Sequence, residues 1–327
     1  VWLSHEKGKV ARLPLAKASA ILAEASIVGH DTKEFFKALL GAGCQQLPIV
    51  KHDTAQGSFL LNPLRKSRAL ADLVGVESLD DPRLAMAALW VVYEQQKSAF
   101  AELPDLQQVA QTMDFLLINV LAQMEFRGIK IDASKLEKMN KSLAQEIAAV
   151  QQNIYDMVGY EFNVASPAQL ASALFDKLLL PTAGIKKGKT GYSTNQKELD
   201  KLRGQHPIIE LVERFRELSK LQNTYVAALP EQTDANGYIH TTFNQDATAT
   251  GRLSSTNPNL QNIPIRTELG RQIRDAFVPA PGNVFVNADY SQFELRLAAV
   301  MAGEKQMIED FNTDVDIHAK TAAEVYN

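Results

Sequence analysis

Two stretches of apolar residues at three- and four-residue spacing constrain the fold more than any other feature of the sequence. Between Ser134 and Met157 this spacing places the apolar side chains on one face of a helix. They are Leu136, Met139, Leu143, Ile147, Val150, Ile154 and Met157. Ser134 and Glu137 predict a capping box at the start of this helix, and Gly159 predicts its end.

A second long helix is predicted after Pro207, because proline is favoured at the first position of a helix. Its buried face would carry Ile208, Val212, Phe215, Leu218, Leu221 and Tyr225. Two apolar stripes of this kind can cover each other, so we predict an antiparallel helical pair.

The connection between the two helices, residues 184–194, is rich in basic residues. It holds Lys186, Lys187 and Lys189 among glycines and hydroxyl residues, which predicts a mobile loop that contacts phosphates. An ordinary solvated loop can have the same composition. Charge alone leaves both interpretations open.

The regions on either side of the helical pair mix strands and helices. Residues 1 to about 105 alternate helical segments with short β-branched runs at 27–28 and 49–50, which predicts an α/β unit. Beyond Pro230, Tyr238 to Phe243 alternates like a strand, and Asn283 to Asn287 is predicted to be a buried strand. A helix is expected from Ser291 to Gly303. The sequence therefore predicts an α+β protein of several domains.

Composition narrows the class of protein. The chain has 327 residues with 46% hydrophobic content, enough for a sizeable core. Its net charge of -4 gives no sign of a surface that is basic throughout, so any contact with nucleic acid must be local. The single cysteine excludes an intrachain disulfide and a cysteine-clustered zinc site. No apolar run reaches the roughly 18 residues of a membrane span, so we expect a cytoplasmic protein.

Asp289 is the first candidate for chemistry, because it follows the predicted strand directly. A carboxylate at the exit of a strand is held by the sheet and can bind the Mg²⁺ that phosphoryl transfer requires. An Asp in this position is also common as a helix cap or turn residue. Its neighbours in sequence must decide between the two.

The polar stretch from Thr248 to Pro264 is the second candidate. Its Arg, Asn and Gln side chains are the groups that contact phosphates and the minor-groove edges of bases without reading sequence. The alternative is a long structural loop that satisfies its own polar groups.

Together these segments resemble a known family. Thr250 to Ser255, Pro258 to Pro264, Asp289 to Arg296, and Asp316 to His318 with Thr321 and Ala322 are similar in order and spacing to the family A DNA polymerases of the bacterial DNA polymerase I type. Weaker similarity covers residues 124–129, 162–163, 166–170, 192–194 and 219–225. The resemblance therefore spans nearly the whole chain.

The resemblance implies roles for individual residues. Asp289 would be one of the two aspartates that hold both Mg²⁺ ions, with the Tyr290 carbonyl also on the metal, and Glu294 would exclude a ribose 2′-hydroxyl. Arg296 would brace the site, in which Phe293 stands where the family usually has Ile. The incoming deoxynucleoside triphosphate would contact Tyr290, Gln292, Glu294 and His318. Primer–template DNA would contact Thr250, Arg252, Asn259, Gln261 and Asn262, together with the three loop lysines.

The same resemblance divides the chain. Residues 1–105 are similar to a ribonuclease H-like 3′-to-5′ exonuclease domain, 134–230 to a thumb, 231–303 to part of a palm, and 304–327 to the start of the fingers, all of 106–327 being a partial polymerase domain. Asp31 and Phe35 stand where the exonuclease has Asn and a metal-binding Asp, and residues 82–93 contain no carboxylate. We expect this domain to be inactive, although Asp31 and Glu34 leave an altered metal site open.

The resemblance also predicts what the chain can do by itself. A fingers helix with Lys and Tyr and a later His-Asp-Glu motif are not found before Asn327, and the chain opens at Val1 rather than Met. We therefore expect a fragment that does not extend primers, from a monomeric polymerase that does. The rival hypothesis is a non-catalytic DNA-binding module derived from a polymerase.

Overall fold

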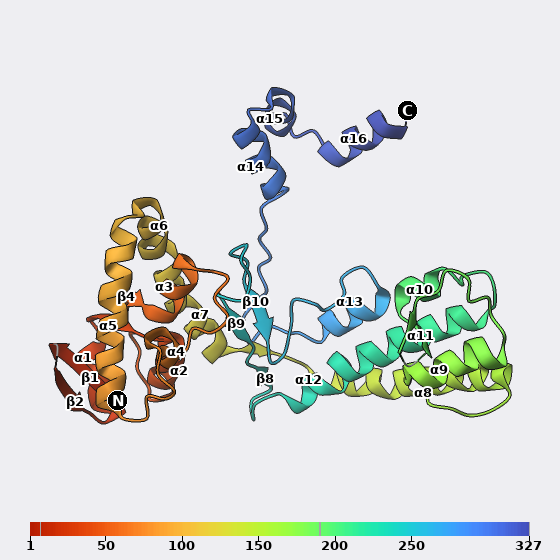
Figure 1. Ribbon diagram of the computed structural model, residues 1–327, viewed down its shortest axis with the longest axis horizontal. Helices are drawn as coiled ribbons and strands as arrows, with labels where there is room; N and C mark the ends of the chain where they lie inside the picture. The colour runs from red at the N-terminus through yellow and green to blue at the C-terminus, as the bar shows by residue number, and fades with distance from the viewer. Residues whose placement is uncertain (7, 190, 327) are drawn as a thin grey trace. The chain divides into compact units, whose positions relative to one another are not determined.

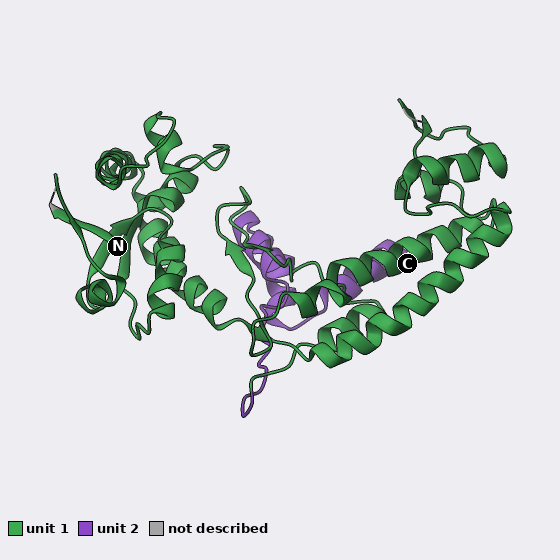
Figure 2. Ribbon diagram, turned by 90° about the horizontal axis from the view of Figure 1, so that it is seen from below, with its two compact units in different colours: residues 1–280 green, residues 281–327 purple. Residues whose placement is uncertain are grey.

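The computed structural model describes residues 1–6, 8–189 and 191–326, and these form two compact units (Figures 1 and 2). The first unit is Val1–Ala280 and the second is Pro281–Asn327. No helix of the described residues is long and apolar enough to cross a membrane.

The N-terminal part of the first unit is an α/β layer, as predicted. Strands β3 and β4 pair in parallel, with Ser26 opposite Ile49, and α2 connects them. The elements are β1 Trp2–Glu6, β2 Lys9–Arg12, α1 Leu15–Leu22, β3 Ser26–Gly29, α2 Thr32–Gly41, β4 Ile49–Asp53, α3 Thr54–Leu61, α4 Leu70–Val74, α5 Pro82–Ala101, α6 Pro104–Val109, the π-helical turn η1 Ala110–Asp114 and α7 Phe115–Arg127. The core of this layer includes Phe36 and Val50 and continues through Phe115 to Ala122 on α7, beyond residue 105.

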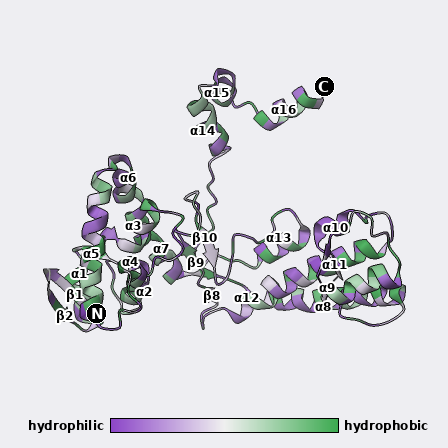
Figure 3. Cartoon of the chain, in the orientation of Figure 1, coloured by the Kyte–Doolittle hydropathy of each residue, from purple (hydrophilic) through white to green (hydrophobic). Residues whose placement is uncertain are grey.

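The predicted helical pair is confirmed. Helices α8 Ala133–Val158 and α11 Ile208–Leu221 lie side by side, and their apolar faces alternate with polar ones (Figure 3). The cap of α8 differs from the prediction, because Asp132 and not Ser134 is the capping residue. The Asp132 carboxylate accepts the backbone N–H of Ser134 at 3.1 Å and the Ser134 hydroxyl at 2.6 Å. A carboxylate is the stronger acceptor for the free N–H groups of a helix start. Gly159 ends the helix at a φ of 86°, which glycine adopts readily.

Shorter elements complete this part of the chain. Those between and after the paired helices are α9 Pro167–Ala171, η2 Ser172–Lys177, β6 Lys187–Gly188, β7 Gly191–Tyr192, α10 Gln196–Asp200, η3 Gln222–Val226 and α12 Ala228–Glu231. Tyr225 lies in η3 but is buried, as the apolar pattern predicted. The large core of the unit is built on the α8–α11 pair.

The predicted strand from Tyr238 to Phe243 is two strands. Strand β8 Tyr238–Ile239 pairs with β5 Ile129–Lys130, whereas β9 Thr242–Asn244 pairs with β10 Ser254–Thr256. The chain changes partner because His240 and Thr241 bond elsewhere: His240 Nδ1 lies 2.8 Å from the Glu125 carbonyl, and the Thr241 hydroxyl donates to the Pro258 carbonyl at 2.7 Å. Helix α13 Glu268–Asp275 follows.

The second unit is helical, and here the predicted strand at 283–287 is wrong. Residues 283–290 have no regular structure, and Val284 and Val286 are 80% and 84% exposed. A strand requires hydrogen bonds to a partner, and the described residues of this unit contain no other strand. The predicted helix is confirmed as α14 Phe293–Ala302, ending at Gly303. It packs with α15 Lys305–Asn312 and α16 Ile317–Tyr326 around Ala299, Phe311 and Ile317.

Candidate functional site

The turn before α14 carries the residues predicted for metal and nucleotide binding. Asp289 and Tyr290 lie in the exposed segment before the helix, Gln292 begins it with a φ of 53°, and Glu294 lies in its first turn. Arg296 holds the turn, because its Nε donates to the Ser291 carbonyl at 2.9 Å and its guanidinium lies 4.6 Å from the centre of the Phe311 ring. The turn is therefore fastened to both α14 and α15.

The donors of this turn suit Mg²⁺, a hard cation that binds oxygen and keeps several waters. Asp289 offers an exposed carboxylate and Tyr290 a backbone carbonyl in a segment with no regular structure. Among the described residues, no group of three or more His, Cys, Asp or Glu side chains is placed to hold a metal ion. Asp289 is therefore not part of such a group among the described residues.

His318 lies in the first turn of α16. Asp316 caps this helix, because its Oδ1 accepts the backbone N–H groups of His318 and Ala319 at 2.9 Å and 3.1 Å. The His318 side chain is exposed, while its neighbour Ile317 enters the small core. In the described part of the chain, no hydrogen bond or ion pair joins His318 to Asp289.

The predicted DNA-contact residues of the polar stretch lie around the β9–β10 hairpin. Thr250 and Arg252 lie in the loop between the two strands, where the Thr248 hydroxyl donates to the Arg252 carbonyl at 2.7 Å. The hydroxyl of Ser255, which is 1% exposed, accepts the N–H groups of Leu260 and Gln261 at 3.1 Å and 3.3 Å. The buried bonds of this stretch thus hold its backbone in place.

The side chains of the predicted contacts lie at the surface of this stretch, as do those of Thr256 and Asn257. Arg252, Asn259, Gln261 and Asn262 are exposed. Bonds within the stretch involve two of these amides: the Gln261 amide donates to the Leu253 carbonyl at 3.2 Å, and Asn259 Oδ1 accepts the Gln261 N–H at 3.1 Å. Both interpretations of the sequence therefore have support, because the loop satisfies many of its own polar groups and still displays amide and guanidinium groups.

The three predicted loop lysines lie at the end of the helical pair where α8 ends and α11 begins (Figure 1). Strands β6 and β7 form a short antiparallel hairpin there, and the side chains of Lys186, Lys187 and Lys189 are exposed. Lys187 Nζ lies 5.0 Å from the centre of the Tyr192 ring, and the backbone N–H of Lys186 donates to Glu198 at 3.1 Å. Residue 190, which the predicted loop includes, lies outside the described residues.

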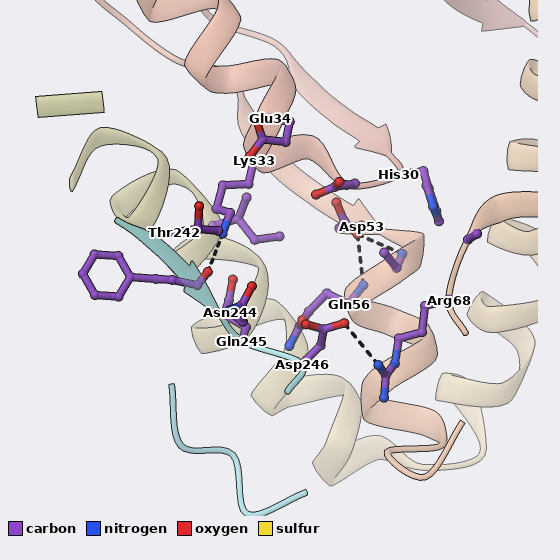
Figure 4. A pocket seen from close by; sticks show the side chains of 15 residues that line it. His30, Lys33, Glu34, Asp53, Gln56, Arg68, Thr242, Asn244, Gln245 and Asp246 are labelled. Atoms are coloured by element: carbon purple, nitrogen blue, oxygen red, sulfur yellow. Dashed lines mark hydrogen bonds and ion pairs between the residues drawn. The ribbon is translucent and has the colours of Figure 1, made fainter. Parts of the chain in front are cut away.

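A pocket of about 340 Å³ lies at the start of α2 and the end of β4 (Figure 4). Its lining includes Asp31, Glu34 and Asp53. The first two are the residues at which the resemblance to an exonuclease left an altered metal site open. Partial burial raises the pKa of Asp31, and the charges of Asp53 and Glu34 raise it further. Burial in the same pocket lowers the pKa of His30.

Both carboxylate oxygens of Asp53 accept hydrogen bonds from neighbouring residues. Its Oδ2 accepts the N–H and hydroxyl of Thr32 at 2.7 Å and 2.8 Å, and its Oδ1 accepts the N–H groups of Ala55 and Gln56 at 2.9 Å and 3.0 Å. Asp53 therefore caps α3 and fixes the start of α2. With both oxygens in use, it is not available as a metal ligand.

Sequence reasoning missed Glu125, which is buried on α7 with 1% of its side chain exposed. Its oxygens lie 2.7 Å from Lys33 Nζ and 3.0 Å from Lys37 Nζ, and Oε1 accepts the Phe243 N–H at 2.7 Å. A signal was available, because Glu125 is the one acidic residue of a largely apolar helix. Its partners are distant in sequence and could not be named.

Comparisons with known proteins show which family the chain resembles. Residues 133–327 match the family model of DNA polymerase family A. DNA polymerase I of Geobacillus stearothermophilus is 44% identical over 256 residues, which cover 76% of this chain and 29% of that protein. DNA polymerase I of Bacillus caldotenax is 49% identical over 213 residues, 64% of this chain and 24% of that protein.

A solved structure extends the similarity to nearly the whole chain. The POL domain of Pol1 from M. smegmatis, in complex with DNA primer-template and dNTP, matches with a TM-score of 0.84 at 35% identity, covering 95% of this chain and 56% of that one. The class that fold and sequence define is thus that of nucleic-acid polymerases. This chain belongs to DNA polymerase family A and is of the bacterial DNA polymerase I type. It spans less than a third of the length of both curated relatives, 29% of one and 24% of the other.

Proposed function

We propose that the protein to which these residues belong is a template-directed DNA polymerase, in which a primer 3′-hydroxyl attacks the α-phosphate of a deoxynucleoside triphosphate and pyrophosphate leaves. The observation that carries the proposal is the Asp289–Arg296 turn, fastened to α14 and α15 by Arg296 in a chain of this family. The structural neighbour supports the substrate class, because it is a complex with DNA primer-template and dNTP.

The chain would contribute one side of the reaction centre. Asp289 and the Tyr290 carbonyl are the proposed ligands for two Mg²⁺ ions, which when bound align the attacking hydroxyl and neutralise charge on the phosphates. Glu294, in the first turn of α14, would lie against the sugar and exclude a 2′-hydroxyl. Gln292 and His318 would contact the incoming nucleotide, and Arg296 would keep the turn in register with the helix.

DNA would contact two separate parts of the first unit. At the β9–β10 hairpin the exposed Arg252, with Thr250 and the amides of Asn259, Gln261 and Asn262, would contact the duplex near the primer terminus. At the far end of the helical pair, Lys186, Lys187 and Lys189 would contact phosphates. Helices α8 and α11 would serve as the thumb that joins the two contact regions.

The N-terminal α/β layer is proposed to be a ribonuclease H-like exonuclease-type domain that does not hydrolyse DNA. Asp53 supports this proposal, because both of its oxygens are used by backbone and threonine groups. Phe35 offers no oxygen to a metal. If the chain degraded single-stranded DNA with Mg²⁺ or Mn²⁺ and lost that activity on Asp31→Ala, the altered site at Asp31 and Glu34 would be real and this proposal wrong.

Primer extension tests the main proposal. This chain, the longest natural polypeptide that contains it, and the Asp289→Ala variant of that polypeptide are compared on a primed template with Mg²⁺ and all four deoxynucleotides. We expect the long polypeptide to incorporate nucleotides, and its variant and the 327-residue chain not to do so. If none extends the primer while duplex binding persists, the rival hypothesis of a non-catalytic DNA-binding module replaces this one.

We further propose that the active protein is a monomer in the bacterial cytoplasm, associated with the nucleoid.

A further inference from the structure

The buried carboxylate of Glu125 joins three segments that are far apart in the sequence. It lies on α7, its cationic partners Lys33 and Lys37 lie on α2, and it accepts the backbone N–H of Phe243 on β9 at 2.7 Å. Lys33 Nζ also donates to the Phe243 carbonyl. Both polar groups of the Phe243 backbone are therefore bound by one ion pair.

The residues after Phe243 are held in the same way. Arg68 Nη1 donates to Asp246 at 3.2 Å (Figure 4). The Arg68 guanidinium lies 5.1 Å from the centre of the Phe59 ring. The Gln245 amide donates to the Asp114 carbonyl at 3.1 Å. The segment 243–246 is thus fixed at Phe243, Gln245 and Asp246, in each case by groups that come from residues 33–125.

This segment leads directly into the predicted DNA-contact loop. Strand β9 pairs with β10, with Phe243 opposite Ser255, and the loop between them carries Thr250 and Arg252. The strands are three residues each, and their ladder is too short to be stable alone. The position of the loop must therefore depend on what holds β9 from outside.

The ion pairs of Glu125 are buried enough to stabilise the position of β9. Lys33 is 13% exposed and Glu125 is 1% exposed, so removal of either partner leaves an uncompensated charge in a poorly solvated place. An exposed pair such as Lys97 with Glu94, at 61% and 54%, is expected to contribute little. The chain thus offers a matched contrast between a buried and an exposed lysine within one domain.

We propose that Lys33, Lys37 and Arg68 are positioning residues for DNA binding: they make the N-terminal α/β layer a brace that fixes the β9–β10 hairpin and its DNA-contact loop. The inference rests on the proposed function, since it concerns how the duplex is bound. It assigns the layer a task that does not depend on hydrolysis. Helix α2 carries two of the three cations, and the positions where the resemblance places exonuclease residues, Asp31 and Phe35, lie at its start.

The test compares Lys33→Met with the matched control Lys97→Met. Amide hydrogen exchange of residues 242–256 and the affinity for a primer–template duplex are measured for both variants and the unaltered protein. For Lys33→Met we expect exchange in this hairpin to rise by about tenfold or more, with severalfold weaker duplex binding, and for Lys97→Met no change in either. Lys33→Arg, which keeps the charge, should restore most of both.

Two results would overturn the proposal. If exchange in the hairpin is unchanged in folded Lys33→Met, the brace does not exist. If exchange rises but duplex affinity does not change, the brace does not position the loop. Arg252→Ala then separates the causes: weaker binding by that variant confines the failure to the brace, whereas unchanged binding removes the proposed loop contact as well. Should Lys33→Met not fold, Arg68→Gln takes its place with the same expected results.

Discussion

Two buried carboxylates of the first unit, Asp53 and Glu125, have surroundings different from those of Asp289 in the second unit. Asp53 and Glu125 are buried, and their oxygens accept hydrogen bonds or ion pairs from the fold. Asp289 is exposed in a segment of no regular structure. A carboxylate whose lone pairs are already used stabilises the fold, while an exposed one remains available to a cation. Asp53 is therefore expected to contribute to stability, and Asp289 is the carboxylate proposed for metal binding.

Removal of Asp289 should separate activity from stability most clearly. In the active full-length polypeptide, Asp289→Ala is expected to lower nucleotide incorporation by about a thousandfold, since the metal ions lose one of their ligands. Its thermal unfolding should remain that of the parent, because an exposed side chain contributes little. Steady-state incorporation measures the effect, with exposed Glu309→Ala on α15 as the control. A variant that retains full activity would remove Asp289 from the metal site.

Removal of the Asp53 carboxylate should lower stability. Asp53→Ala deletes the cap of α3 and the bonds to Thr32, and we expect it to cost about 3 kcal/mol of unfolding free energy. Urea denaturation measures this value, and Asp80→Ala, at an exposed carboxylate that accepts the Ser78 hydroxyl at 2.9 Å, is the control. A loss below about 0.5 kcal/mol, the usual range for a surface position, would show that Asp53 is not structural.

The three loop lysines extend the comparison to exposed side chains that are proposed to bind DNA and not to stabilise the fold. Alanine at Lys186, Lys187 and Lys189 should reduce the slope of log affinity against log salt by about 0.9 for each phosphate that the protein no longer neutralises. Stability should not change measurably, because all three side chains are exposed. Duplex binding is titrated between low and moderate salt. If the slope is unaltered, the hairpin touches no phosphate and the solvated-loop interpretation holds.

A smaller effect is expected from pH. His52 is 5% exposed, and burial lowers its pKa from the ordinary value of 6.5. The unfolded chain therefore binds a proton at His52 more readily than the folded chain does. The contribution of neutral His52 to the free energy of unfolding is fully present above about pH 6.5, and it declines as the pH falls from there towards the folded pKa. Thermal unfolding at pH 7.5 and 5.5 should show the decline. His52→Gln, which can still donate to Gln96, should lessen it, and an equal decline in this variant would exclude His52 as the cause.

Local signals in the sequence predicted the helical pair and α14 correctly. The spacing of apolar residues on α8 and α11 needs no distant partner to be recognised, because the periodicity itself places them on one face. The family resemblance likewise rested on contiguous motifs. The cap of α8 was misplaced by two residues, from Asp132 to Ser134, because both residue types are common helix caps.

What could not be predicted depends on contacts between distant residues. The run at 283–287 has the composition of a strand, yet a strand exists only with a hydrogen-bonded neighbour, which composition does not supply. The division of the run from Tyr238 to Phe243 also follows from remote groups, since Glu125 and Pro258 accept the bonds that turn the chain. The ion pairs of Glu125 were missed for the same reason.

The length of the helical pair has a mechanical consequence. Helix α8 has 26 residues, so at about 1.5 Å per residue it is a lever of about 39 Å. A rotation of about 5° at its base would move its far end by about 3 Å, roughly the rise between successive base pairs. If the lysine hairpin beyond that end binds phosphates as proposed, such a rotation shifts it by about one base-pair step while the hydrogen bonds inside the helices stay intact.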